Sequence, residues 1–391
     1  MHRSLVVNLL VLAFGLIVAT TVIGLVTLWP DDRTIEPAPG SIPTDTEQAR
    51  VVAVREAPCA QGSTASCRRV TVELLSGPDR DERTSFTVGN VREDVEVSVG
   101  DRVRVFANPV PPGTAVGGVQ ADRYAFADFE RRTPLALLFL LFAALVVATG
   151  RLRGLRALVG LVGSLAVIIV FLVPAILDGK TPETVALIGA FAVMLVTIPL
   201  AHGLGVKTLA ACLGTSVSLI LTLVLAQAFT DLAHLTGISS DEAIFLRATA
   251  GEISLQGLLL AGMIIGALGV LDDLTVSQAS TVLALQRANP AQGFGSLFRG
   301  AVSVGQDHIA ATVNTLVLAY VGASLPVLLI FSFGGTGFTD AVSSEAVAAQ
   351  IVAMLVGSIG LILAVPVTTA LAALLATRVR TGASEHAHAH V

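Results

Sequence analysis

Residues Thr184–Leu200 read TVALIGAFAVMLVTIPL, a stretch without a single Asp, Glu, Lys or Arg. A helix needs about 20 consecutive, mostly apolar residues to cross a hydrocarbon core ~30 Å thick. About seven further stretches of similar length and character occur along the chain. The sequence therefore predicts an α-helical polytopic membrane protein with about eight transmembrane helices.

The other predicted helices are distributed from one end of the chain to the other. They are Leu5–Trp29, Pro134–Thr149, Leu155–Leu177, Val206–Phe229, Ser254–Leu271, Ile309–Phe333 and Ala348–Ala376. The first resembles a signal peptide, but its apolar part exceeds the usual 7–15 residues and no Ala-x-Ala site follows it. We therefore expect this first helix to be an uncleaved anchor.

The composition supports a membrane protein and argues against other classes. Of the 391 residues, 53% are hydrophobic and only 14% are charged, whereas soluble domains carry roughly 25% charged residues. The formal net charge is −5, and no basic patch suggests a nucleic-acid partner. The expected partners are the lipid bilayer and a small ion or small-molecule substrate.

Basic residues set the expected orientation, because short cytoplasmic loops are enriched in Lys and Arg. The short loop 151–156 has Arg at its first, third and last positions, which predicts that it faces the cytoplasm. With eight helices, both termini then lie on the cytoplasmic side. The expected organisation is an N-terminal transmembrane anchor (1–30), a linker (31–43), an extracytoplasmic β domain (44–132), a seven-helix transmembrane domain (133–377) and a cytoplasmic tail (378–391).

The segment after the first helix has the pattern of short β-strands. Residues 102–106 alternate polar and apolar side chains, and turn-forming residues bound this and similar runs. About five strands in so short a segment favour a small β-barrel of oligonucleotide-binding (OB) or SH3-like shape. Cys59 and Cys67 lie in this segment, and in an oxidising compartment their spacing favours a structural disulfide.

Two neighbouring carboxylates, Asp272 and Asp273, follow an apolar run and are the first candidate site. At 100° per residue, the helix face of Asp273 also carries small residues. The members of this face are Gly262, Gly266, Gly269, Ser277 and Ser280. We expect the glycines to permit close helix packing. Asp272 points about 100° away from Asp273, so the two acids have different surroundings.

The next apolar helix carries the second candidate set, Asp307, His308 and Asn314. If both flanks of the turn at Asn289–Gly293 are helical, Asp273 and Asp307 lie at similar depth in an antiparallel hairpin. Their oxygens suit a hard cation, and His308 would admit a transition metal or a proton relay. A simpler interpretation remains, in which both acidic pairs mark the point where the helices meet water.

The residues around both acidic pairs resemble those of the bacterial YibE/F-like membrane proteins. The resemblance rests on Gly266–Ser280 and on Gly305–Tyr320. It implies one anchor, an extracytoplasmic β domain and a block of seven helices in the bacterial plasma membrane. It implies no activity, and no catalytic or binding residue is carried over from it.

These observations leave three functions open. The first is a transporter or exporter that uses the acidic cluster for cation or proton coupling, with a bound cation as its only candidate cofactor. The second is a non-transporting envelope protein whose β domain binds a partner or polymer. The third is a two-aspartate intramembrane protease, although Gly269–Asp272 lacks the Gly-x-Gly-Asp pattern of those enzymes and no other catalytic motif occurs. We expect no enzyme, and the oligomeric state stays open.

Overall fold

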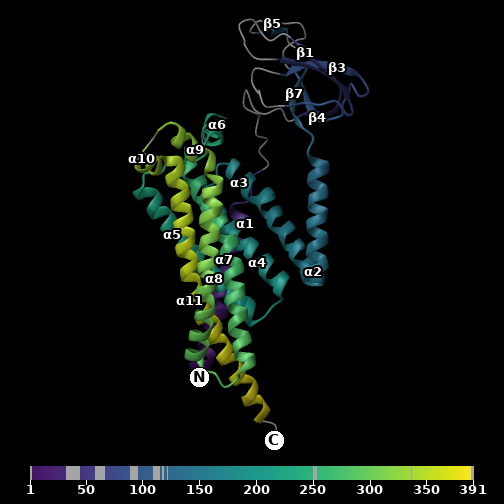
Figure 1. Ribbon diagram of the computed structural model, residues 1–391. Coiled ribbons are helices and arrows are strands. Elements are labelled where there is room, and N and C mark those ends of the chain that lie inside the picture. Colours follow the sequence, from purple (N-terminus) through teal and green to yellow (C-terminus); the bar gives the residue numbers. More distant parts are fainter. Residues whose placement is uncertain are drawn as a thin grey trace. The chain divides into compact units, whose positions relative to one another are not determined.

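In this computed structural model the described residues are 2–31, 45–57, 67–88, 96–108, 115–116, 119–120, 122–249, 253–335 and 337–388. The chain divides into two compact units, Met1–Glu36 with Val146–Val391, and Pro37–Leu145. The first unit consists of helices and the second contains the strands (Figure 1).

The second unit is built on a curled antiparallel sheet. Its strands are β1 (Thr46–Ala57), β2 (Cys67–Leu74), β3 (Arg83–Val88), β4 (Arg102–Ala107) and β7 (Tyr124–Phe129). They are ordered β3-β2-β1-β4-β7, and every neighbouring pair is antiparallel. The edge strands β3 and β7 contact each other, which curls the sheet. Two short strands, β5 (Ala115–Val116) and β6 (Val119–Gln120), form a separate pair.

Alternation along the strands explains the core of the sheet. In β4, Val103 and Val105 are buried while Arg102 is exposed, as the period of two predicts. These valines pack with Phe86 and other fully buried side chains. Cys67 at the start of β2 is disulfide-bonded. Its predicted partner, Cys59, lies outside the described residues.

The helices occupy most of the remaining chain. They are α1 (His2–Thr27), α2 (Arg132–Ala166), the π-helix η1 (Val167–Leu172), α3 (Val173–Leu177), α4 (Pro182–His202), α5 (Val206–Leu232), α6 (Asp241–Thr249), α7 (Leu255–Ala288), α8 (Phe294–Ala323), α9 (Leu325–Phe333), α10 (Phe338–Ser343) and α11 (Glu345–His388). Among the described residues, six helical segments are long and apolar enough to cross a membrane. The pair α8 and α9, bent by 57°, makes a seventh if it counts as one span.

One of these six segments is too long for a single crossing. Arg132–Leu177 has 46 residues, which at 1.5 Å per residue is about 69 Å, more than twice a ~30 Å hydrocarbon core. Arg151 interrupts it with φ 50° and ψ −129°. A Cβ on Gly154 would lie 2.2 Å from the carbonyl oxygen of Val146, so this turn has no room for a side chain. With this segment counted as two crossings and the pair α8 and α9 as one, the described helices give eight candidate crossings, which is consistent with the eight predicted helices.

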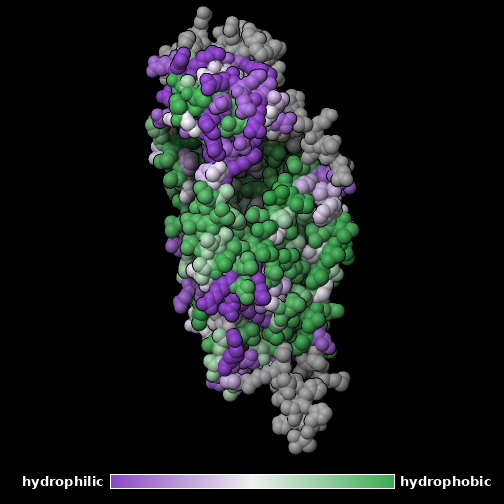
Figure 2. Space-filling model, turned by 90° about the vertical axis from the view of Figure 1, so that its right-hand side faces the viewer, coloured by the Kyte–Doolittle hydropathy of each residue, from purple (hydrophilic) through white to green (hydrophobic). Residues whose placement is uncertain are grey.

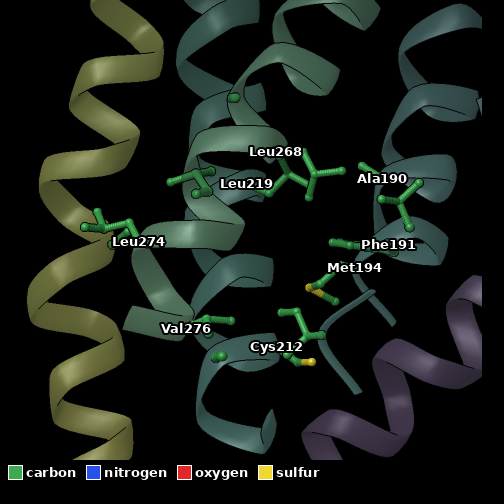
Figure 3. Packing of buried hydrophobic residues seen from close by; sticks show 14 of the residues in the cluster. Ala190, Phe191, Met194, Cys212, Leu219, Leu268, Leu274 and Val276 are labelled. Carbon is green, nitrogen blue, oxygen red and sulfur yellow. The ribbon is translucent and has the colours of Figure 1, made fainter. Parts of the chain in front are cut away.

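The core of the helical unit lies among α4, α5, α7 and α11. Side chains of α4, α5 and α7, including Phe191, Cys212 and Leu268, pack together in Figure 3. On the face of the helical unit that Figure 2 shows, much of the surface is hydrophobic and is interrupted by a hydrophilic patch. This is the surface expected of helices surrounded by lipid.

The helices α7 and α8 are longer than the sequence predicts. The predicted helix Ser254–Leu271 continues to Ala288, so Asp272 and Asp273 lie inside α7 and not at its end. The predicted helix Ile309–Phe333 begins at Phe294, so Asp307 also lies inside a helix. The prediction ended the first of these helices too early and began the second too late, because it followed the apolar runs, whereas the helices continue through amphipathic turns.

Candidate functional site

A pocket of about 390 Å³ lies among α2, η1, α4 and α7 and contains the first acidic pair. Most of its lining is apolar, from residues such as Leu161, Ile168 and Leu268. Its polar lining residues are Ser164, Thr197, His202, Asp272 and Asp273. Carboxylates thus line a mostly apolar cavity between helices long and apolar enough to span a membrane.

Asp272 is the better enclosed of the two acids. Its Oδ2 atom accepts a hydrogen bond from Oγ1 of Thr197 on α4 at 3.1 Å. Its Oδ1 atom is buried and has no hydrogen-bond partner among the described residues. A buried carboxylate oxygen without a donor is costly unless a proton or a cation reaches it.

The polar contacts of Asp272 continue into the bundle along α7. The Oγ1 atom of Thr275 donates to the carbonyl oxygen of Asp272 at 3.2 Å and lies 2.7 Å from Oγ1 of Thr215 on α5. Both threonines are fully buried. One turn of α7 therefore presents a carboxylate toward α4 and a hydroxyl toward α5.

Charges of both signs gather around His202 at the end of α4. Its Nδ1 atom lies 3.0 Å from Nζ of Lys207 at the start of α5. The imidazole also interacts electrostatically with Asp273 and Arg153. Asp273 is exposed, so it lies at the open side of the pocket, whereas Asp272 is more enclosed. Sequence reasoning missed His202 because it lies far from both acidic pairs along the chain.

The second candidate set does not join this pocket. Two contacts show that α7 and α8 are antiparallel: Nε2 of Gln278 donates to the carbonyl oxygen of Ala301 at 2.7 Å, and a Cβ on Gly266 would lie 3.4 Å from Oη of Tyr320. Asp273 and Asp307 both lie between these contacts, at the similar depth that the hairpin predicted.

Similar depth does not bring the two acidic pairs together. Asp307, His308 and Asn314 are exposed on α8, and none of them lines the pocket. Within the described parts of the chain, no group of three His, Cys, Asp or Glu residues could hold a metal ion. The expected set of Asp273, Asp307 and His308 is therefore divided between two surfaces.

The predicted glycine face of α7 is open. A Cβ on Gly262 or Gly269 would have no described atom within 4 Å, so neither glycine supports a close helix contact within this chain. Gly269 instead lines the pocket. Ser277 and Ser280 are half-buried. The Ser280 hydroxyl donates to the carbonyl oxygen of Val276 at 2.7 Å, an ordinary bond within the helix.

Close packing occurs at positions that the sequence did not single out. Gly305 is buried, and a Cβ there would lie 2.6 Å from Cγ1 of Val365 and 2.9 Å from Oε1 of Gln278. The Gln278 amide is 2% exposed. Besides its bond to α8, it donates to Oγ1 of Thr369 on α11 at 2.7 Å. The sequence did contain a signal for this packing, namely the uncharged amide of Gln278 in the same apolar helix as Asp273.

The strand unit holds a separate charged cluster. Tyr124 donates to Oδ2 of Asp79 at 2.6 Å, and Arg123 pairs with the same oxygen at 2.6 Å. Burial and this hydrogen bond raise the pKa of Tyr124 to about 12. Burial and the negative charge of Asp79 raise the pKa of Glu47, against the effect of Arg123. The cluster joins β1 to β7 and is a candidate pH-sensitive element.

Comparison with known proteins identifies a family. A family model described as YibE/F-like protein matches residues 138–378, which run from α2 to α11 and include the pocket and all of α8. No curated protein and no solved structure matches the chain. The match agrees with the resemblance seen around the two acidic pairs.

Proposed function

The chain belongs to the YibE/F-like family, and from this premise we propose that it is a transporter or exporter coupled to a proton or a cation. Its several apolar helices and its family make it a multi-pass membrane protein. The proposed coupling site is the pocket around Asp272, in place of a site shared by Asp273 and Asp307. It is a carrier and not an enzyme.

One observation carries this proposal: an intramembrane carboxylate faces an apolar pocket with one oxygen lacking a donor. Hydrocarbon cannot stabilise such a charge, so the group is protonated or holds a cation. Thr197 and Asp272 supply oxygen atoms, which hard cations prefer. Loading and release of that proton or cation would change the net charge of the pocket, and this is the step that we assign to coupling.

The proposed orientation places both termini in the cytoplasm of a bacterial cell and the strand unit outside it. Figure 1 supports a shared side for the two termini, because the start of α1 and the end of α11 lie at one end of the helical unit, together with the connection between α7 and α8. Arg287 and Arg299 flank that connection. Cytoplasmic loops of membrane proteins are enriched in such residues.

A second function is favoured by the strand unit, which has its own buried core. A carrier does not need such a unit, so we propose as an alternative that a barrel-like (OB or SH3-like) domain binds an envelope partner or polymer. Removing residues 44–131 separates the two. A cation response that persists in the remaining helices favours the carrier, and a response that disappears with folded helices favours the alternative.

The test of the carrier is thermal unfolding of the purified full-length protein with Na⁺, K⁺, Mg²⁺, Ca²⁺, Mn²⁺ or Zn²⁺ and over a pH series. A cation present at 100 times its Kd stabilises a protein by ~2.7 kcal/mol, which is readable as a shift in Tm. We expect the shift in the wild type and in Asp307→Asn, and its loss in Asp272→Asn.

A proton leaves a different signature from a cation. If no cation shifts the Tm, we expect a pH jump across proteoliposomes to move charge in the wild type and in Asp307→Asn but not in Asp272→Asn. Asp307→Asn is the matched control, because it neutralises an exposed acid on α8. An Asp272→Asn protein with the full cation and proton responses would overturn the proposal.

A further inference from the structure

A second pocket of about 390 Å³ lies beside the first turns of α7, where α6, α8 and α11 meet that helix. We call it the α6 pocket. Its walls are mostly apolar and include Leu246 on α6, Leu258 and Met263 on α7 and Ala353 on α11. It shares no lining residue with the pocket around Asp272, which is formed further along α7. Its volume falls within the ~300–1,000 Å³ of pockets that hold small organic molecules.

The polar lining of the α6 pocket suits a positive charge. Among the described residues that line it, Glu242 on α6 is the one that carries a charge, and Tyr320 on α8 contributes an aromatic ring. A carboxylate attracts a cation by charge, and the face of an aromatic ring attracts it by a cation–π interaction. A bare metal ion would leave the apolar walls in contact with water, which is unfavourable. The lining therefore favours a small organic cation with an apolar body.

The glycine face of α7, made of Gly262, Gly266 and Gly269, joins this pocket to the pocket around Asp272. Gly262 lines the α6 pocket, and Gly269 lines the other. At 100° per residue the three glycines lie within about 60° of one another over two turns, and all three are exposed. The nearest described atom to a Cβ on Gly266 is Oη of Tyr320, at 3.4 Å. The tyrosine of the α6 pocket therefore narrows this face between the two pockets.

The pocket at the other end of the glycine face attracts a ligand of the same charge. Asp272 and Asp273 both line it, and Oδ1 of Asp272 is buried without a described hydrogen-bond partner. We propose that the α6 pocket is a second cargo site, which binds a small organic cation with an apolar body, and that this cation moves between the two pockets along the glycine face. The proposal rests on the carrier function above and names its cargo. A proton or cation at Asp272 competes with such a cargo for the same carboxylate, which couples the two.

Equilibrium binding of tetraphenylphosphonium to the purified full-length protein tests the α6 pocket, with the anion tetraphenylborate as the control of matched shape. The wild type should bind the cation more tightly than the anion. Glu242→Gln removes the charge in the pocket and should lower the affinity for the cation severalfold. Asp241→Asn removes the neighbouring acid on α6, which does not line the pocket, and should keep the affinity. Equal affinities in the wild type and Glu242→Gln would overturn the proposal.

Uptake of tetraphenylphosphonium into proteoliposomes, driven by a pH gradient with the membrane potential clamped at zero, tests the path. Gly266 lines neither pocket, so Gly266→Leu should keep the binding affinity of the wild type and lose most of the uptake. Gly322→Leu on α8 is the control, because it also lines neither pocket and has no described atom within 4 Å of a Cβ, and it should keep both. Uptake by Gly266→Leu at the rate of the wild type would overturn the path.

The Asp272→Asn protein separates this proposal from the carrier function itself. We expect it to bind tetraphenylphosphonium in the α6 pocket and to lose the uptake. If the wild type responds to inorganic cations or protons through Asp272 but does not bind tetraphenylphosphonium, the carrier stands and the organic cargo is overturned. Binding that disappears in Asp272→Asn and persists in Glu242→Gln would place the cation in the other pocket and would also overturn the proposal.

Discussion

Thr197 on α4 donates a hydrogen bond to Asp272 on α7 at 3.1 Å, and this contact separates the roles of two consecutive acids. Asp272 turns into the pocket, while Asp273, about 100° further around the helix, is exposed. The hydroxyl satisfies one carboxylate oxygen and leaves the other without a described donor. A group held in this way can exchange a proton or cation without first breaking an ion pair.

The first prediction concerns this hydroxyl. Thr197→Val keeps the shape of the side chain and removes the donor to Asp272. Hydrogen bonds to charged groups contribute roughly 1.5–3 kcal/mol, so we expect cation affinity to fall about tenfold or more. Titration of the Tm shift against cation concentration measures this. Ser164→Ala, which removes a pocket hydroxyl that donates to the carbonyl oxygen of Gly160 at 3.0 Å within its own helix, should leave the affinity unchanged. Equal affinities in the wild type and Thr197→Val would show that the contact does not serve the site.

The second prediction concerns the close approach at Gly305. A leucine there must displace Val365 on α11 and Gln278 on α7, because even a Cβ would lie within 3 Å of both side chains. Overpacking typically costs about 1–3 kcal/mol and occasionally more, so we expect a lower Tm in detergent for Gly305→Leu. Gly322→Leu on the same helix is the control, since no described atom lies within 4 Å of a Cβ there. Equal Tm values for Gly305→Leu and Gly322→Leu would contradict the prediction.

The third prediction concerns the buried amide of Gln278, which joins three helices. Gln278→Leu leaves the hydroxyl of Thr369 and the carbonyl oxygen of Ala301 without their donor. Unsatisfied buried groups cost about 1–3 kcal/mol each, so the free energy of unfolding should fall. A double-mutant cycle with Thr369→Val isolates the pair, because contacting residues are not additive. Strict additivity would mean that the 2.7 Å contact contributes nothing.

The membrane class and the helix positions follow from the sequence because hydropathy directly reports the cost of exposing apolar side chains or burying charged ones. The same reasoning predicted the depth shared by Asp273 and Asp307. It could not show which side of α7 meets which helix, because the small residues around Asp273 permit several neighbours. Both acids line the pocket, but the one with a buried oxygen is Asp272, which the sequence placed outside the small-residue face.

The glycines illustrate the same limit. A glycine in a membrane helix permits close packing without requiring it, so Gly262 and Gly269 could not be distinguished by sequence from Gly154 and Gly305, where the packing is tight. Whether a glycine is tightly packed depends on which residues, distant in sequence, lie against it, and only the three-dimensional structure shows these neighbours. Residues that are polar without being charged, such as Gln278, carried a weaker signal than the acids although they join more helices.

The last prediction concerns the pH dependence of the strand unit. Burial and the charge of Asp79 raise the pKa of Glu47 above its ordinary value, and one of its carboxylate oxygens is buried without a described hydrogen-bond partner. The folded strand unit therefore favours protonated Glu47. The contribution of Glu47 to the stability of the strand unit is present below the ordinary pKa of a glutamate, and it is lost as the pH rises through the raised pKa.

Glu47→Gln removes the buried charge, so at pH 7 the variant should protect the amides of β1 more strongly than the wild type does. At pH 4 the two proteins should be equal. Hydrogen exchange of full-length protein, read on peptides covering residues 46–57 and corrected for the intrinsic rate at each pH, measures the difference. Glu56→Gln at the exposed end of the same strand should change nothing. Equal protection in Glu47→Gln and the wild type at pH 7 would show that ionisation of Glu47 does not destabilise β1.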